Sequence, residues 1–324
     1  MGLDDSHAYS GKPDKNENLS EENQMKRHYI LFVLGATAAL LMSACGGGAA
    51  PGGADLLSDV TARGYILIST DPNYEPQSFL NTSGSRPADT KCPSDALTTA
   101  EMQGFDVDVA TEIGTRLGVE TCFATPEWDM ITAGSWANKW DLSVGSMTIT
   151  PDRQERLDFT TPYYYTPAVI AVNADSGITS LEQLSGQTIC VATATTYESW
   201  LNGALDLPAE SIYAQPPAGL EQMVLPTDQE CAQAIQAGRT EFVGYITSGT
   251  VVDSNIAGGL NVAKVDGAVF AENLAAAVDK ASAKPTASFL EAVSGHIDAM
   301  HADGTLAALS MKWFDTDLTQ DPSK

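Results

Sequence analysis

The stretch from Gly104 to Ala124, GFDVDVATEIGTRLGVETCFA, decides the fold class of this chain. Its first part predicts a helix that begins near Gly104 and runs to about Leu117. Gly118 follows, and glycine is the residue that most often ends a helix. The next residues, Val119 to Ala124, are mostly β-branched or apolar and predict a strand. A helix followed at once by a strand is typical of an α/β architecture.

The same alternation continues on both sides of this stretch. Upstream, Leu56 to Arg63 predicts a short amphipathic helix that Gly64 ends, before a strand from Tyr65 to Ser69. Further strands are expected at Asp141 to Gly145, Pro167 to Asn173, Thr188 to Ala192, Glu241 to Ile246 and Leu274 to Val278. Further helices are expected at Tyr197 to Leu205, Gln229 to Ala237, Ser288 to Ala302 and Thr305 to Phe314. We therefore predict mixed, mainly parallel sheets flanked by helices.

The order of strands, helices and cysteines divides the chain into two lobes. Residues 173–267 have their own strand and helix alternation and their own cysteine pair, so we expect them to form lobe 2, inserted into lobe 1. Lobe 1 is then built from residues 55–172 together with residues 268–324. Two chain crossings would join the lobes and act as a hinge.

Residues 25–45, MKRHYILFVLGATAALLMSAC, show the order of basic, apolar and small residues that is typical of an export signal. The apolar run is too short for a membrane span of about 20 residues. The segment resembles a bacterial lipoprotein signal, which implies a signal peptide of residues 25–44 and a lipid on Cys45. Residues 1–24 are expected to form a polar extension, and residues 45–54 a glycine-rich tether. We therefore expect an extracytoplasmic protein, lipid-anchored to the bacterial cell membrane.

Charge and histidine content exclude several functions. The chain has 17 Lys and Arg against 42 Asp and Glu, a formal net charge of −25. Nucleic acid is therefore not an expected partner, because its phosphates require a basic protein surface. No CxxC spacing occurs, and only His296 and His301 follow the signal segment, so no metal site is expected. Asp106 and Asp108 are expected to be a helix N-cap and a first-turn acid rather than metal ligands.

The cysteines predict disulfides. If Cys45 carries the lipid, an even number of cysteines remains in an oxidising compartment, and two disulfides are expected. Four cysteines allow three pairings. The simplest pairing joins neighbours in sequence, Cys92 with Cys122 and Cys190 with Cys231, because each pair then falls inside one lobe.

Small hydroxyl residues and one arginine gather where a strand gives way to a helix, in Ser146-Met147-Thr148-Ile149-Thr150-Pro151-Asp152-Arg153. Such a group suits a carboxylate, because a guanidinium offers two parallel donors while hydroxyls and the free N–H groups of a helix start supply the rest. The spacing alone fits equally well a capped helix with a solvated arginine.

Over nearly all of residues 56–316 the chain resembles the family 3 extracellular solute-binding proteins, the polar amino-acid receptors of ABC importers. The matching segments are Ser69 to Pro76, Gly104 to Ala110, Trp128-Asp129, Asp141 to Arg153, Asp158-Phe159-Thr160, Leu184-Ser185-Gly186 and Gly304 to Phe314. The resemblance implies a type II periplasmic-binding-protein-like fold, with two α/β lobes that close on a small solute and do no chemistry on it. It also implies an ABC permease as partner and no cofactor. We expect a monomer.

The resemblance assigns roles to residues of both lobes. It implies that Arg153 binds the α-carboxylate of the solute, with Ser146 and Thr148 donating from the same lobe. In lobe 2, the turn that carries Thr195 and Thr196 is implied to donate hydrogen bonds to the same carboxylate. Helix capping is an equally compatible role for these two threonines.

An acid and two aromatic residues are implied to contact the solute side chain. Asp71 and Tyr74 stand in the first-strand loop, and Trp128 stands at the position that covers the opposite face. Two aromatic rings and one carboxylate suit a flat or cationic group. The alternative is that Tyr74 and Trp128 fill lobe 1 and that Asp71 caps a turn.

The chain departs from the family pattern at two places in lobe 2. Ala194 stands where the family usually has glycine. After Gly244, where the family places an aspartate for the α-ammonium, the window reads Tyr245-Ile246-Thr247-Ser248 and contains no acid. Another carboxylate such as Glu198 could take the ammonium, or hydroxyls and carbonyls could, or the solute is not a standard α-amino acid.

We therefore predict an extracytoplasmic receptor that binds a small polar solute, an amino acid or a relative, and delivers it to an ABC transporter by hinge closure. The alternative is an exported enzyme of the dehydratase type on the same scaffold. Catalysis would require a positioned acid or base in the cleft, and the histidines after the signal lie in the C-terminal helical region, away from it.

Overall fold

The computed structural model describes residues 55–322. The polar extension, the export signal and the whole tether, including Cys45, lie outside these residues. The helices are α2 (Leu56–Arg63), α3 (Phe105–Leu117), α4 (Trp128–Thr132), α5 (Pro151–Gln154), α6 (Thr196–Leu201), α7 (Asp228–Gln236), α8 (Gly249–Ala257), α9 (Ala287–Ala302) and α10 (Thr305–Phe314). The main strands are β1 (Tyr65–Ser69), β6 (Glu120–Ala124), β7 (Leu142–Thr148), β8 (Leu157–Asn173), β9 (Thr188–Ala192), β10 (Glu221–Leu225), β11 (Gly244–Ser248), β12 (Val262–Lys264) and β13 (Phe270–Asp279). Short strands are β2 (Asn73–Tyr74), β3 (Ser78–Leu80), β4 (Leu97–Thr98) and β5 (Met102–Gln103).

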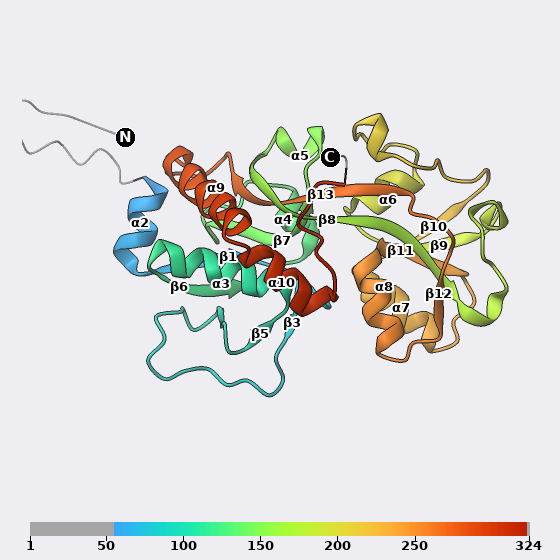
Figure 1. Ribbon diagram of the computed structural model, residues 1–324, viewed down its shortest axis with the longest axis horizontal. Helices are drawn as coiled ribbons and strands as arrows, with labels where there is room; N and C mark the ends of the chain where they lie inside the picture. The colour runs from blue at the N-terminus through green and yellow to red at the C-terminus, as the bar shows by residue number, and fades with distance from the viewer. Residues whose placement is uncertain (1–54, 323–324) are drawn as a thin grey trace, which may run out of the picture. The chain divides into compact units, whose positions relative to one another are not determined.

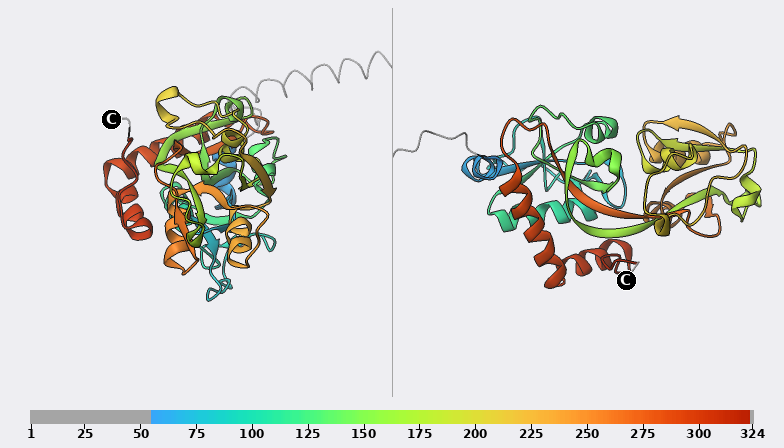
Figure 2. Two further views of the ribbon diagram at one scale, coloured as in Figure 1. Left: turned by 90° about the vertical axis from the view of Figure 1, so that its right-hand side faces the viewer. Right: turned by 90° about the horizontal axis from the view of Figure 1, so that it is seen from above.

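One sheet continues through both lobes, in the order β10-β9-β11-β8-β13-β7-β1-β6-β4, with β12 paired to β8. In lobe 1, β1 pairs in parallel with β6 and β7, and in lobe 2, β9 pairs in parallel with β10 and β11. Between them β8 and β13 pair antiparallel, and Figures 1 and 2 show these long strands running from one lobe to the other. The predicted two-lobe α/β fold with a two-segment hinge is therefore confirmed. The boundaries predicted near residues 172 and 268 stay predictions, because β8 and β13 are continuous across the junction.

Helix α3 shows how the sequence builds the core of lobe 1. Its residues Phe105, Val109 and Ile113 are each 0% exposed and follow the four-residue spacing that places side chains on one helix face. They belong to the same buried cluster as Ile66 and Ile68 of β1. This packing fixes β1 and its neighbour β7, and the carboxyl ends of these two strands carry the candidate site.

Lobe 2 has its own hydrophobic core and contains a disulfide. Trp200 of α6 is buried among residues of β9 and β11, and its Nε1 donates to the Ala214 carbonyl over 2.8 Å. Cys190 of β9 is bonded to Cys231 of α7, which ties the start of α7 to the sheet.

The first disulfide belongs to lobe 1. Cys92 is bonded to Cys122 of β6, so the segment that carries Cys92 is attached to the sheet. Both disulfides are those of the simplest pairing.

The structure corrects the extent of several predicted elements. β8 begins at Leu157 rather than Pro167, although prolines usually lie outside strand interiors. Pro162 is accommodated because it stands where the register of β8 against β13 shifts. β11 lies at Gly244–Ser248 rather than at residues 241–246, and α6 ends at Leu201 rather than at residue 205.

Several elements of lobe 2 were not predicted, among them α8 and β10. α8 (Gly249–Ala257) begins with a glycine and is rich in β-branched residues, which are weak helix formers. β10 (Glu221–Leu225) is an edge strand with a polar start, so it lacks a clear alternating pattern. Tertiary packing decides both elements.

Candidate functional site

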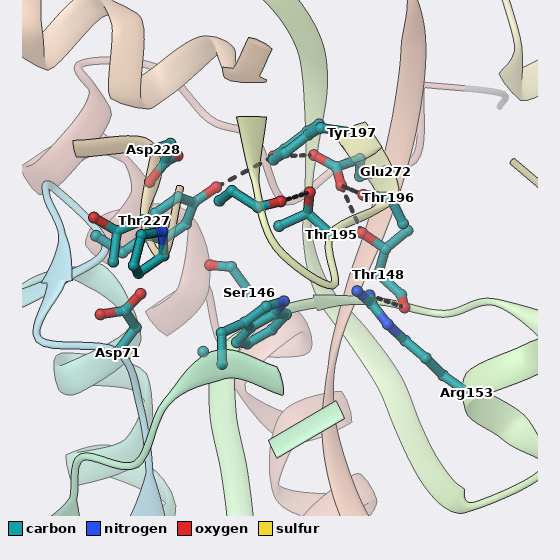
Figure 3. Close-up of a pocket in the computed structure, with 15 residues that line it drawn as sticks. Asp71, Ser146, Thr148, Arg153, Thr195, Thr196, Tyr197, Thr227, Asp228 and Glu272 are labelled. Carbon is teal, nitrogen blue, oxygen red and sulfur yellow. Dashed lines mark hydrogen bonds between the residues drawn. The ribbon is translucent and has the colours of Figure 1, made fainter. Parts of the chain in front are cut away.

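A pocket lies at the junction of the two lobes, next to the hinge strands. Figure 3 shows the side chains that converge on it. All eight residues for which the sequence predicts contact with the solute line this pocket: Asp71, Tyr74, Trp128, Ser146, Thr148, Arg153, Thr195 and Thr196. The pocket is also lined by two acids that the sequence analysis did not single out, Asp228 and Glu272.

Arg153 is buried at the base of the cleft. It follows β7 on the short helix α5, where the Thr150 hydroxyl accepts a hydrogen bond from the Arg153 backbone N–H over 3.2 Å. Its guanidinium donates to the carbonyls of Thr148, over 2.9 Å, and Ala194, over 3.2 Å, and lies 5.5 Å from the ring of Trp128. Burial lowers the pKa of Arg153 to about 10, so the group stays charged at neutral pH. Its guanidinium has no carboxylate ion-pair partner among residues 55–322.

The turn after β9 brings lobe 2 over this arginine. Thr195 is the N-cap of α6 and accepts a hydrogen bond from the Glu198 N–H. Ala194 has a φ of 58°, in the left-handed region that favours glycine, which explains why glycine is usual at this position. Glu198 accepts a hydrogen bond from the Ala194 N–H over 2.8 Å and lines a neighbouring groove instead of the pocket. Glu198 is therefore not among the residues that line this pocket, and its suggested role with the solute ammonium stays a prediction.

Glu272 of β13 is the least expected member of the site. It is 2% exposed and accepts hydrogen bonds from the hydroxyls of Thr148, over 2.6 Å, Thr196, over 2.9 Å, and Tyr197, over 2.7 Å. Burial raises the pKa of its carboxyl group. Two hydroxyls that were expected to meet the carboxylate of the solute thus donate to a carboxylate of the chain. An acid near the start of the otherwise largely apolar strand FAENLAAAVD was the sequence signal that could have revealed it.

Ser146 is also engaged by the protein. Its hydroxyl donates to Asp106 over 2.7 Å and contacts the Tyr164 hydroxyl at 2.6 Å, and the Tyr163 hydroxyl donates to Asp106 over 2.8 Å. Asp106 is therefore not the N-cap of α3, contrary to the prediction, and Gly104 occupies that position. The physical reason is that the Asp106 side chain turns into the core, where these hydroxyls satisfy its oxygens. Asp108, in contrast, lies in the first turn and binds Lys312 and Trp313.

Asp106 gives a prediction for the dependence of stability on pH. Burial raises its pKa to about 7 in the folded state, so the folded protein keeps a proton that the unfolded chain has lost above about pH 4. The contribution of Asp106 to stability is full below about pH 4 and falls as the pH rises to about 7. Asp106→Asn removes this dependence. We therefore expect the free energy of unfolding of the variant to rise, relative to that of the wild type, by up to about 1.4 kcal/mol for each pH unit between about pH 4 and pH 7.

Thermal unfolding of both proteins in buffers from pH 4 to pH 7.5 measures the effect. Asp108→Asn, in the same helix turn, is the matched control. A difference between the Asp106→Asn variant and the wild type that is constant with pH would contradict the assignment.

In the folded structure, Asp228 is an acid that lies close to residues 245–248, where the sequence has no acid. It is the first residue of α7, after the N-cap Thr227, and it is 4% exposed. Its carboxylate accepts a hydrogen bond from the hydroxyl of Thr247, inside that window. Burial raises the pKa of Asp228 to about 7. Sequence alone could not show this, because α7 and β11 meet only in the folded lobe.

Asp71 and Asp228 lie at one end of the pocket, on opposite lobes, and Figure 3 shows Glu272 and Arg153 at the other end. Asp71 accepts a hydrogen bond from the Asn73 N–H over 2.8 Å and so does cap a turn, as the alternative expected. Burial raises its pKa as well.

The lobes are in direct contact across the cleft. The Ala194 carbonyl of lobe 2 accepts hydrogen bonds from Arg153 and from Nε1 of Trp128, both over 3.2 Å. The hydroxyls of Tyr74 and Tyr197 lie 3.3 Å apart. These contacts describe a closed arrangement of two lobes around the pocket.

Other kinds of site find no support in the described part of the chain. Residues 55–322 contain no cluster of three or more His, Cys, Asp or Glu side chains arranged to hold a metal ion. Neither His296 nor His301 lines the pocket, and the His301 ring instead contacts the Pro162 carbonyl at 2.8 Å. In the same residues, no helix has the length and apolar character that a membrane span requires.

Two α/β lobes that meet over a polar, interlobar pocket define a hinged solute-binding protein. Residues 66–316 match the bacterial extracellular solute-binding proteins, family 3, and the chain belongs to this family. The description of the family agrees with the expected export, and it describes binding proteins rather than enzymes.

Individual relatives support the same class. The L-cystine-binding protein TcyJ of Escherichia coli (strain K12) is 27% identical over 274 residues, which cover 82% of this chain and 88% of that protein. The L-cystine-binding protein TcyA of Bacillus subtilis (strain 168) is 25% identical over 299 residues, covering 90% and 97%. The solved structure of an ancestral amino acid-binding protein, a precursor of cyclohexadienyl dehydratase, has a TM-score of 0.64 and 26% identity, covering 80% of this chain and 99% of that chain.

Proposed function

We propose that this protein is an extracytoplasmic receptor that binds an amino acid and delivers it to an ABC transporter. The observation that carries the proposal is Arg153, a buried guanidinium that lines the interlobar pocket, interacts electrostatically with Glu272 and makes no ion pair with a carboxylate of the described residues. A buried cation requires a counter-charge, and the carboxylate of an amino acid is a suitable one. The relatives named for amino-acid binding, including a probable amino-acid ABC transporter-binding protein of Haemophilus influenzae, support the same solute class.

Binding would proceed by closure of the hinge. The solute would dock on lobe 1 through Arg153, and the Ala194 to Thr196 turn of lobe 2 would then close over it. Ser146 and Thr148 would donate hydrogen bonds to the solute from lobe 1, and Thr195 would orient the turn of lobe 2. Their hydroxyls serve the chain's own groups in this structure, so contacts between them and the solute require a partial exchange of hydrogen bonds.

The side chain of the solute would lie between Tyr74 and Trp128, near Asp71. Tyr74 and Trp128 both contact the opposite lobe, which places their rings on the walls of the cleft. Titration of the full protein with a panel of the standard amino acids, followed by calorimetry and tryptophan fluorescence, tests the function. Failure of every amino acid to bind would overturn it.

We also propose that the receptor is a monomer tethered to the membrane through a lipid on Cys45. The support for the lipid anchor is the sequence of residues 25–45, which lies outside the described residues. We expect Cys45→Ser to abolish labelling by a radioactive fatty acid and to release the protein from the membrane fraction of expressing cells. Membrane retention of the unlabelled variant would contradict lipid anchoring, and Cys92→Ser serves as the control that keeps the label.

A further inference from the structure

The pocket contains more acidic than basic side chains. Three carboxylates line it, those of Asp71, Asp228 and Glu272, and Arg153 is the one lysine or arginine among its lining residues. Buried charges require compensation, and hydrogen bonds from hydroxyls provide only part of it. The remaining negative charge therefore indicates that the solute contributes positive charge.

Glu272 and Arg153 lie close enough to serve the two ends of one amino-acid head group. Both contact Thr148, whose hydroxyl donates to Glu272 and whose carbonyl accepts from Arg153. A carboxylate has about four acceptor positions, and three donors reach Glu272 in this structure, so one position remains for an N–H of the solute. An α-ammonium beside Glu272 would leave the α-carboxylate next to Arg153.

Asp71 and Asp228 form a second acidic place at the other end of the pocket. They come from opposite lobes, Asp71 from the loop after β1 and Asp228 from the start of α7. Two carboxylates that share one closed cavity repel each other. A cationic group between them would replace this repulsion by attraction and would favour closure of the lobes.

We propose, building on the function proposed above, that the solute carries two cationic groups: an α-ammonium held by Glu272, and a second held between Asp71 and Asp228. Because Arg153 is the one lysine or arginine that lines the pocket, a second solute carboxylate, as in L-cystine, would lack a cationic partner. The solute class is thus a basic amino acid with a net positive charge. Glu272 thus binds the ammonium in place of the aspartate that is absent from residues Tyr245 to Ser248. A neutral amino acid would fill the head-group subsite and leave the second acidic place without a counter-charge.

Pairs of solutes with nearly equal shape and different charge test this proposal. We expect L-arginine to bind at least roughly 100-fold more tightly than L-citrulline, and L-lysine more tightly than L-norleucine by a similar factor, in calorimetric titrations of the full protein at pH 7.5. Citrulline binding within tenfold of arginine, or a preference for L-cystine, would overturn the inference while leaving the amino-acid receptor intact. If no amino acid binds, the proposed function fails as well.

Charge-neutral variants assign the two acidic places. Asp228→Asn should reduce the ratio of arginine to citrulline affinity by at least tenfold and leave citrulline binding nearly unchanged. Glu272→Gln should weaken arginine and citrulline by the same factor, because both have an α-ammonium. Asp71→Asn gives the same readout as Asp228→Asn if the latter fails to fold, and exposed Asp129→Asn, on α4 at the neighbouring groove, is the control that should not alter the ratio. An unchanged ratio in folded Asp228→Asn and Asp71→Asn would exclude the second acidic place.

Discussion

Arg153→Ala is expected to lower the affinity for the best-binding amino acid by about 2–5 kcal/mol, roughly 30-fold to several thousand-fold. The reason is that Arg153 is 5% exposed and would be the cationic partner of a solute carboxylate in the pocket. Calorimetry with the wild type and the variant measures the loss directly. Affinity that survives the substitution unchanged would remove Arg153 from the site.

Two further variants separate charge, geometry and folding. Arg153→Lys keeps a positive charge but cannot reach both the Thr148 and the Ala194 carbonyls in the way the guanidinium does, so we expect an intermediate loss. Arg156→Ala is the matched control, because this arginine follows α5 but faces solvent and binds Asp152. Melting temperatures of all three variants show whether a loss of affinity reflects the site or the fold.

Opening the disulfide between Cys190 and Cys231 is expected to lower stability by about 4 kcal/mol, because a cross-link across 41 residues restricts the unfolded chain. In a protein of this size such a loss corresponds to a fall in melting temperature of about 10 °C. Solute affinity should fall too. The bond attaches α7 to the sheet, and the first residue of α7 is Asp228, which lines the pocket.

The double variant Cys190→Ser/Cys231→Ser tests this by thermal unfolding and calorimetry. Cys92→Ser/Cys122→Ser is the matched control, since that bond spans 30 residues and neither cysteine lines the pocket. The control should lose a similar amount of stability and keep its affinity. Equal affinity in both double variants would show that the position of Asp228 does not depend on the disulfide.

Local sequence was sufficient where short-range physics decides the structure. The helix and strand within residues 104–124 were predictable because apolar spacing, a terminating glycine and a β-rich run are all local signals. The residues expected around the pocket were predictable because the chain resembles the family at the segments that carry them. The extent of β8 was not predictable from local sequence, because its tolerance of Pro162 depends on a register shift against β13.

The sequence by itself indicated the two-lobe class, and its resemblance to the family indicated eight of the residues that line the pocket. Only the tertiary structure decided the charge inside it. Glu272 reaches the hydroxyl of Thr148 because β13 pairs with β7, and Asp228 reaches Thr247 because α7 packs beside β11. These contacts join residues more than a hundred and about twenty positions apart, respectively, so no local pattern encodes them. Electrostatic energy depends on distance in space, which exists only after the strands have paired.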